Sequence, residues 1–368
     1  MKACPASTAQ LGASWGLAGW LGQSPKLPAA ARWVLALVVL AVLATFLPAR
    51  AASEKKQSGT APPRARVGLV FDVGGRGDKS FNDAAYLGVS KAERELGVEA
   101  SYLEPSSTED REAALRLFAA RSFDIVIGVG FIFSSDIDEV ARAYPNVRFA
   151  GVDYAPGPRG IPRNVAALAF REEEGSFLVG AVAGLMSKSG HVGFVGGMSG
   201  PLIRKFEVGY VAGVEAACPR CVIHAAYAGT TPDAFRDPAR GKALANAQIA
   251  AGSDVIYHAS GSTGHGVFEA AGDARVLAIG VDADQYDEMK GTVITSMIKR
   301  GDVAVFNIVR DVVEGRFAGG MRVFGLLDDA VDYVHEGPHG AGIPDDVKRK
   351  VEALRADVVS GRVVVPNR

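Results

Sequence analysis

The residues best suited to chemistry stand directly after predicted β-strands, in loops that lead into helices. In open α/β sheets, ligands bind at the carboxyl ends of the strands, so these loops are the first place to look for a site. The first loop carries Asp72, Phe81 and Asn82. A carboxylate, an amide and an aromatic ring together suit a neutral polar ligand with a flat ring. The alternative is structural, with Phe81 as a hydrophobic staple and Asn82 as a helix cap.

The same loop is a poor candidate for phosphate. Its glycines precede Lys79-Ser80, as in a Walker motif, but Asp78 occupies the place of the required glycine and its charge repels a phosphate. The dinucleotide fingerprint G-x-G-x-x-G is absent from the chain as well. We expect Ser80, which precedes the predicted helix, to act as its N-cap.

Two later loops offer further ligand groups. Phe206 falls in the first turns of a predicted helix after the glycine-rich residues 196–200, so its ring faces either a ligand or the core. Gly261 lies in a segment of glycines and hydroxyl residues, 259–266, at a helix start. Backbone N–H groups in such a segment suit ligand oxygens or an anion.

A carboxylate and an ammonium group end two later strands. Asp282 follows the strand VLAIGV, and Lys299 closes the strand predicted over 293–298. A carboxylate accepts two hydroxyl donors, so this pair suits a vicinal diol. The structural alternatives are a solvated helix cap for Lys299 and an N-cap for the nearby Asp284.

The sequence gives little indication of an enzyme or a metal site. It contains no G-x-S-x-G. His335-Glu336-Gly337-Pro338-His339 matches H-E-x-x-H, but Gly337-Pro338 disfavours the helix that places both histidines of such a motif on one face. We therefore expect no catalytic residues, no metal and no cofactor. Cys218 and Cys221 form C-P-R-C, which leaves open a short structural disulfide or two free thiols. A zinc site would need two more ligands, and only His224 is near.

The elements that position these residues alternate between strands and helices, which predicts an α/β fold. Several strands are continuous apolar runs, as in parallel sheets buried on both faces. Predicted strands cover Val67–Val73, Glu99–Leu103, Ile125–Val129, Val147–Val152, Val165–Phe170, His191–Val195, Val222–Ala228, Val255–His258, Val276–Val281 and Val293–Ile298; predicted helices cover Asn82–Leu96, Thr108–Ala120, Ser134–Tyr144, Glu172–Lys188, Leu202–Ala217, Gly241–Ala251, Gly264–Ala271 and Asp302–Glu314. So many strands favour two sheets over one, because a single core stops growing near ~250 residues.

The first residues have the pattern of an export signal. Four of the 40 basic residues and none of the 41 acidic ones fall in residues 1–52. An apolar core over Trp33–Leu47 is followed by Ala49-Arg50-Ala51, a small-x-small cleavage pattern. We expect a signal peptide over 1–51, a linker over 52–65 and a periplasmic location; the alternative is an uncleaved membrane anchor. The balanced charge gives no indication of nucleic-acid binding.

Taken in order, the motifs resemble one known family. Its members are the basic membrane proteins, which are substrate-binding proteins of ABC transporters. The motifs that carry the resemblance are Asp72-x-Gly-Gly-x-x-Asp78-x-Ser80-Phe81-Asn82, Gly196-Gly197 with Phe206-x-x-Gly209-Tyr210-x-x-Gly213, Gly261-x-x-Gly264, Gly280-Val281-Asp282-x-Asp284-Gln285 and Thr295-Ser296-x-x-Lys299. The resemblance covers about residues 66–368.

The resemblance implies a type I periplasmic-binding-protein fold, in which three crossovers join two Rossmann-like lobes around a ligand cleft. Lobe 1 is expected over about 66–165 with a returning segment near 295–325, and lobe 2 over about 166–292 with the C-terminal segment. The implied partners are a small ligand and the permease subunits of an ABC transporter. The membrane is then reached only through the transporter, or through an uncleaved leader.

The nucleoside receptors of this family suggest roles for individual residues. Phe81 and Phe206 map onto two aromatics that sandwich a purine, Asp72 and Asn82 onto base-edge residues, Asp282 and Lys299 onto ribose-binding residues, and Gly261 onto a segment beside the sugar. This sequence departs from the family in lacking a lipid-attachment Cys, and a short segment before Val293 makes Asp284 an alternative to Asp282. The loop 128–131 is also expected to line the cleft.

Three other functions compete with purine nucleoside binding. A sugar or another small solute would leave binding insensitive to the Phe206→Ala substitution. A nucleoside-cleaving enzyme would turn its ligand over. A ligand-sensing partner of a membrane receptor would not work with a permease and an ATPase.

Overall fold

The computed structural model describes residues 64–106 and 110–368. The signal peptide expected over 1–51 and most of the linker expected over 52–65 lie outside the described residues. Within the described part of the chain, no helix combines the length and the apolar character needed to cross a bilayer.

The first sheet is parallel throughout and forms the centre of lobe 1. Its strands are short apolar runs, and β3 is buried along its whole length because helices cover both faces. The strands lie in the order β11 (Gly320–Phe324), β5 (Val165–Phe170), β4 (Arg148–Val152), β3 (Ile125–Val129), β1 (Arg66–Val70) and β2 (Glu99–Leu103).

The second sheet forms the centre of lobe 2. Its strands are parallel except for one antiparallel pair, β10 with β12. They lie in the order β12 (Val331–Tyr333), β10 (Val293–Lys299), β9 (Leu277–Asp282), β8 (Val255–Ala259), β6 (His191–Met198) and β7 (Val222–Gly229).

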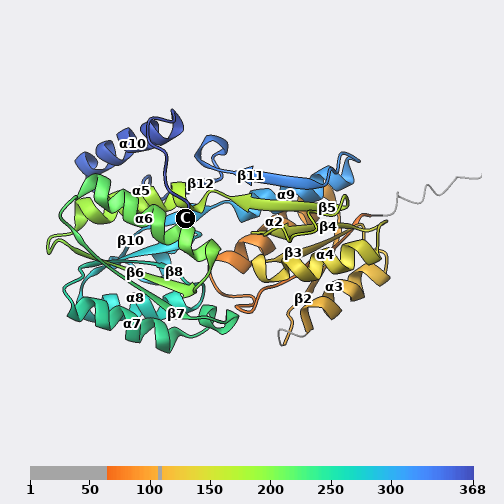
Figure 1. Cartoon of the computed structure of the whole chain (residues 1–368), viewed down its shortest axis with the longest axis horizontal. Helices are drawn as coiled ribbons and strands as arrows, with labels where there is room; N and C mark the ends of the chain where they lie inside the picture. Colours follow the sequence, from red (N-terminus) through yellow and green to blue (C-terminus); the bar gives the residue numbers. More distant parts are fainter. Residues whose placement is uncertain (1–63, 107–109) are drawn as a thin grey trace, which may run out of the picture. The chain divides into compact units, whose positions relative to one another are not determined.

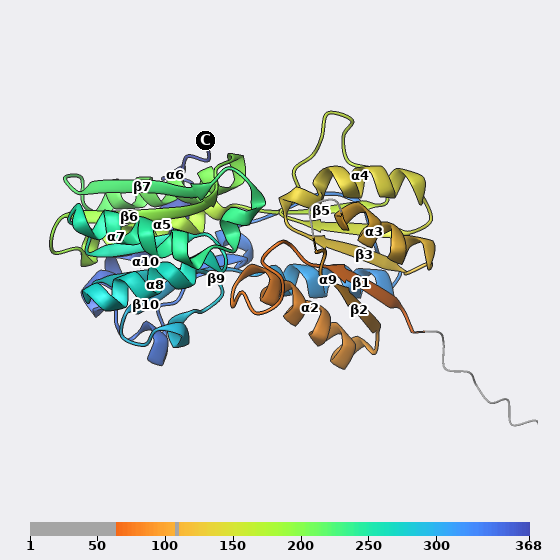
Figure 2. The same cartoon turned by 90° about the horizontal axis from the view of Figure 1, so that it is seen from below.

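Helices pack in pairs on the sheets (Figures 1 and 2). In lobe 1, α2 packs with α9 and α3 with α4; in lobe 2, α5 packs with α6 and α7 with α8, while α10 packs on α5. The helices are α2 (Phe81–Leu96), α3 (Asp110–Ala120), α4 (Ser134–Ala143), α5 (Glu172–Met186), α6 (Pro201–Ala217), α7 (Pro238–Ala250), α8 (Thr263–Ala274), α9 (Gly301–Val313) and α10 (Asp345–Val359). The predicted α/β fold with two sheets is therefore confirmed.

The chain passes between the lobes three times: after β5, after β10 and after β11. The first passage follows Phe170 rather than residue 165, because β5 pairs with β4 in the first sheet. Likewise all of β10, from Val293, belongs to the second sheet, so the returning segment of lobe 1 begins at Gly301.

Two strands and one α-helix of the described residues were not predicted. Strand β11 is a short edge strand with alternating exposure, and β12 has three residues. Helix α10 follows Pro344 and has Asp345 and Asp346 in its first turn, which is a usual helix-start signal. In addition, β1 ends at Val70 rather than at Val73.

Candidate functional site

A cavity between the two lobes brings together every residue predicted to touch the ligand. Its empty space amounts to about 540 Å³, with the solvent at its open mouth included. We call it the interlobe cavity. Its wall contains Asp72, Phe81, Asn82, Phe206, Gly261, Asp282 and Lys299, and also Gly74, Asp78, Phe131, Asp153, Leu202, Ile203, Phe235, Ala259, Ser260 and Val281. Most of these residues follow the carboxyl ends of strands from both sheets, as expected for an α/β fold.

A buried hydrogen-bond network at the start of α2 orients the amide of Asn82. Its Oδ1 accepts from the backbone N–H of Asp72 at 2.8 Å, and its Nδ2 donates to Asp78 Oδ2 at 3.1 Å. Because the oxygen and the nitrogen are thus assigned, one N–H of the amide remains for a ligand acceptor.

Asp78, not Ser80, caps helix α2. The Asp78 carboxylate accepts from the backbone N–H groups of Ser80, Asn82 and Asp83 at 3.0, 2.8 and 3.1 Å. The Ser80 side chain makes no cap and instead donates across the cleft to Asp282 Oδ2 at 2.9 Å. The expectation for Ser80 was therefore wrong, because the better acceptor for the helix N–H groups lies two residues earlier. The hydroxyl of Ser80 joins lobe 1 to lobe 2.

Asp72 is a buried carboxyl group with a perturbed acidity. Its Oδ1 accepts from the backbone N–H of Val73 at 2.6 Å. Burial raises the pKa of Asp72 to about 7, with the hydrogen bond from Val73 opposing that shift. Near neutral pH this side chain therefore exchanges between a hydrogen-bond acceptor and a donor.

This raised pKa predicts a pH effect on stability. Between about pH 4 and pH 7 native Asp72 keeps a proton that the unfolded chain has released, so its contribution lowers the free energy of unfolding as pH rises. A full one-proton difference amounts to about 1.4 kcal/mol per pH unit. We expect Asp72→Asn to gain stability relative to wild type between pH 5 and pH 7 in urea denaturation. Asp284→Asn is the control. If the free energy of unfolding of Asp72→Asn changed with pH as steeply as that of the wild-type protein, the prediction would be contradicted.

The two predicted aromatic side chains both face the cavity, one from each lobe. Phe81 opens α2 and is half-buried, whereas Phe206, on α6, is 3% exposed. The ammonium nitrogen of Lys299 lies 4.6 Å from the ring centroid of Phe81 and 5.3 Å from that of Phe206. Both rings therefore border the same space, and Phe206 is not simply a core residue.

Lys299 lies in a buried group of carboxylates. Its Nζ is 2.7 Å from Asp153 Oδ2, 3.6 Å from Asp282 Oδ1 and 3.9 Å from Glu172 Oε1. Burial alone would lower the pKa of Lys299, but these three carboxylates outweigh it and raise that pKa. Asp153 belongs to lobe 1 and Asp282 to lobe 2, so the ammonium links the lobes.

Three carboxylate oxygens in this group are free to accept more hydrogen bonds. Asp153 Oδ1, Asp282 Oδ1 and Glu172 Oε1 are buried and have no hydrogen-bond partner. Asp153 and Asp282 also share a left-handed backbone, with φ of 59° and 65°, at the carboxyl ends of β4 and β9. Left-handed Asp residues and unsatisfied buried oxygens concentrate where a fold positions groups for a ligand.

The wall of lobe 2 beside Gly261 presents a hydroxyl acceptor. Burial lowers the pKa of His258 to about 3, so its ring is neutral. The Gln285 carbonyl, 3.1 Å from His258 Nε2, requires the proton on that nitrogen, and Nδ1 therefore accepts from Ser260 Oγ at 3.2 Å. With its proton used there, the Ser260 hydroxyl offers lone pairs to the cavity. Gly261 follows with φ of 54°, which glycine adopts without strain.

Asp282 lines the cavity, whereas Asp284 does not. The side chain of Asp284 is 36% exposed and accepts from His339 at 2.6 Å. Residues missed by sequence reasoning are Asp153, Asp78 and Phe235, while Phe131 was included only as part of its loop. Asp153 carried the same signal as Asp282, a carboxylate directly after a predicted strand.

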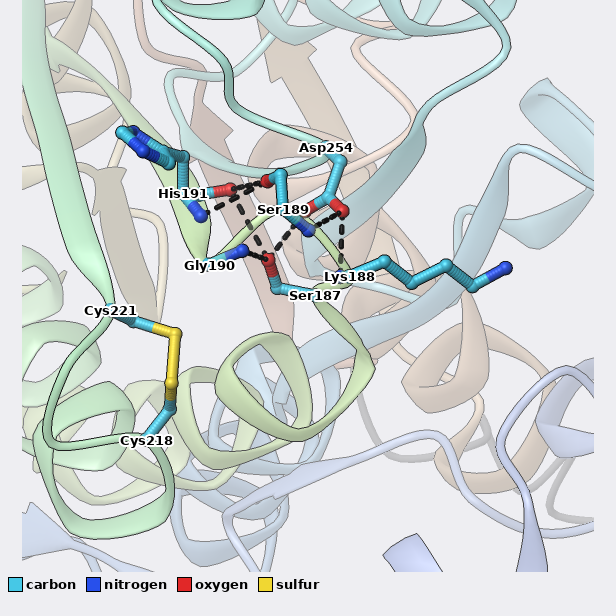
Figure 3. The surroundings of a disulfide bond; sticks show 8 residues. All are labelled: Ser187, Lys188, Ser189, Gly190, His191, Cys218, Cys221 and Asp254. Carbon is cyan, nitrogen blue, oxygen red and sulfur yellow. Dashed lines mark hydrogen bonds between the residues drawn. A yellow bond between two sulfur atoms is a disulfide. The ribbon is translucent and has the colours of Figure 1, made fainter.

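Cys218 and Cys221 form a disulfide (Figure 3). The bridge closes the turn after α6, at the end opposite to Phe206, and the side chain of Cys218 packs at Gly184 of α5. Twelve residues of rise separate Phe206 from Cys218, which is about 18 Å, so the bridge lies away from the cavity and has a structural role. Among residues 64–106 and 110–368, no group of three or more His, Cys, Asp or Glu side chains is arranged to hold a metal ion.

Known proteins resemble this chain in sequence and in structure. A family model described as ABC transporter substrate-binding protein PnrA-like, Bmp, matches residues 65–366. The CD4+ T-cell-stimulating antigen of Listeria monocytogenes is 36% identical over 324 residues, which cover 82% of this chain and 88% of that protein. The ABC transporter nucleoside-binding protein BmpA of Lactococcus lactis is 28% identical over 353 residues, covering 90% and 97%.

A solved structure agrees with these relatives. The crystal structure of an ABC transporter solute-binding protein from Aeropyrum pernix has a TM-score of 0.75 and 32% sequence identity, and the match covers 83% of this chain and 94% of that one.

Proposed function

Because this chain belongs to the Bmp family and is a substrate-binding protein of an ABC transporter, we propose that its substrate is a purine nucleoside held in the interlobe cavity. The observation that carries the proposal is the pairing of two aromatic rings with buried, unsatisfied carboxylate oxygens in one cavity. Rings stack on a heterocycle, and carboxylates accept sugar hydroxyls. The nucleoside-binding relative from Lactococcus lactis supports the same class of ligand.

Each part of the proposed ligand has side chains in the cavity wall that suit its chemistry. Phe81 and Phe206 stack on the two faces of the base. Asn82 donates its remaining N–H to a ring acceptor, and Asp72 pairs with a neighbouring donor when ionised. Asp282 accepts ribose hydroxyls, and Lys299 donates to them. Gly261 and its neighbouring backbone lie against the sugar.

Binding couples to movement of the lobes. A ligand attached to one lobe shifts the equilibrium toward the closed form only through extra contacts with the other lobe. Phe81 and Phe206 belong to different lobes, so sandwiching the base supplies such contacts. Charge composition of residues 1–52 supports an extracytoplasmic location, from which the closed form presents its ligand to the permease.

The direct test identifies the natural ligand. Native mass spectrometry of the purified protein is expected to release a purine nucleoside, and calorimetry is expected to give tighter binding for inosine, adenosine or guanosine than for free ribose or glucose. Preferential binding of a sugar would overturn the proposal. If chromatography after incubation shows that the nucleoside has been converted to base and sugar, the protein is instead an enzyme.

Removing one stacking ring is expected to weaken binding strongly. Aromatic stacking contributes about 1–3 kcal/mol per base, so Phe206→Ala should raise the dissociation constant of a purine nucleoside by about 5- to 150-fold in calorimetry. Phe317→Ala, a half-buried phenylalanine outside the cavity, is the matched control and should bind normally. Equal affinities for the two variants would contradict the sandwich.

A further inference from the structure

A second pair of aromatic rings in the interlobe cavity has no part in the proposed recognition of the base. Phe131 of lobe 1 and Phe235 of lobe 2 meet edge to face, with ring centroids 6.5 Å apart and planes at 76°. Both side chains line the cavity. Because the rings belong to different lobes, their contact exists only while the lobes are closed.

The backbone holds Phe131 firmly on lobe 1. Gly130 precedes it with φ of 107°, and a Cβ there would lie 2.4 Å from Asp72 Oδ2, so only glycine fits this passage. The Gly130 N–H donates to Val152 O at 3.0 Å, and Phe131 O accepts from Ser134 Oγ at 2.7 Å. The ring is therefore carried by a pinned turn beside Asp72.

Phe235 is held equally firmly on lobe 2. It is the last residue of a 3₁₀ turn, Pro232–Phe235. The buried hydroxyl of Thr263 binds the backbone on both sides of Phe235: Oγ1 donates to Ala234 O and accepts from Asp237 N–H, both at 2.8 Å. The ring lies over Gly197, where a Cβ would come within 2.2 Å of it. This close approach needs a glycine and leaves the ring little freedom.

The position of the pair suggests what it does. Asp233 and Arg236, which flank Phe235, line a separate crevice together with Arg111 of lobe 1. Asp233 is 68% exposed at its side chain, so this crevice borders solvent. Phe235 does not line this crevice itself but lies between the two lobe 2 residues that do, so its ring stands where the ligand cavity meets the crevice. Phe131 also lines a second open crevice, together with Leu202 and Lys205 of lobe 2.

We infer that Phe131 and Phe235 form an aromatic gate that closes behind the bound ligand and sets how long the ligand stays enclosed. Edge-to-face pairs contribute beyond their buried area, and this contribution is present only in the closed form. Loss of the gate therefore accelerates release and leaves entry into the open cleft unchanged.

The gate is tested with a double-mutant cycle on ligand release. Phe131→Ala, Phe235→Ala and the double variant are mixed with the fluorescent ribonucleoside 2-aminopurine riboside in stopped flow; residues 53–368 contain no tryptophan to interfere. Each single variant should release the ligand about 2- to 12-fold faster. The double variant should be no faster than the singles, and association should stay unchanged. If the effects of the two single variants on the release rate multiplied in the double variant, the gate would be overturned. Slower association in place of faster release would overturn it as well.

A second measurement needs no ligand and separates this inference from the proposed function on which the first assay rests. Spin labels at two exposed positions, Arg94→Cys on lobe 1 and Glu269→Cys on lobe 2, report the distance between the lobes. Phe235→Ala should shift the distance distribution toward the open form, and the control Phe317→Ala should not. If the wild-type protein binds no nucleoside, the proposed function alone is refuted. If the distance distribution of Phe235→Ala equals that of the wild-type protein, the gate alone is refuted.

Discussion

Replacing Lys299 by methionine is expected to destabilise the protein by about 3–5 kcal/mol near pH 7.5, as measured by urea denaturation. Lys299 is 3% exposed, and its ammonium group lies within 3.9 Å of Asp153, Asp282 and Glu172. Glu172 also pairs with Lys205 at 2.8 Å, but methionine leaves Asp153 and Asp282 buried without a counter-charge, which costs far more than losing an exposed ion pair. The loss should shrink toward pH 5, because burial raises the pKa of Asp282 and of Glu172, so that protonation of these two groups relieves the repulsion.

The design of this test depends on matched variants. Lys242→Met removes a surface ammonium that pairs with Asp273 at 2.9 Å, and it should change the stability far less than Lys299→Met does. Adding Asp153→Asn to Lys299→Met removes one uncompensated charge and should recover part of the loss. If Lys299→Met proved as stable as Lys242→Met, the buried carboxylates would not depend on Lys299.

The second large effect concerns the sugar of the proposed ligand. Inosine is expected to bind at least about 30-fold more tightly than 2′,3′-dideoxyinosine in calorimetry. The dideoxy compound leaves the buried oxygens of Asp153 and Asp282 without partners, and each unsatisfied group costs about 1–3 kcal/mol. Free hypoxanthine, which lacks the sugar altogether, should bind weakly for the same reason.

Two aspartates that are neighbours in sequence provide the control for this prediction. Asp282→Asn should reduce the preference for inosine, because the NH₂ of the new amide cannot accept hydrogen bonds from the ribose hydroxyls. It also cannot replace Asp282 Oδ2 as the acceptor for Ser80 Oγ. Asp284→Asn changes the same residue type outside the cavity and should keep the full preference. Equal affinity of the wild-type protein for both nucleosides would remove the ribose-binding role.

Together, the gate and the charge group suggest how the protein balances retention and release. The ion pair of Lys299 with Asp153 and the ring contact of Phe131 with Phe235 both join the lobes, and so does the hydrogen bond from Ser80 to Asp282. Each contact favours closure over the open form. A transporter that separates the lobes must break these contacts to obtain the ligand.

Much of the fold followed from the sequence, because its signals are local. Apolar runs such as Ile125–Val129 are buried strands, and the helices between them carry the expected periodicity. The rule that ligands bind after parallel strands also selected residues that prove to line one cavity, among them Asp72, Asp282 and Lys299. The edge strands β11 and β12 escaped prediction, since strands this short are defined by their partners rather than by their own pattern.

By itself, the sequence determined the alternation of strands and helices, and with it the side chains that end each strand. Only the tertiary structure decided which of those side chains meet. Lys299 pairs with Asp153, 146 residues away, and Ser80 bonds to Asp282 at a separation of 202. Period and propensity act over a few residues, whereas such pairings depend on how three crossovers bring the ends of two sheets together.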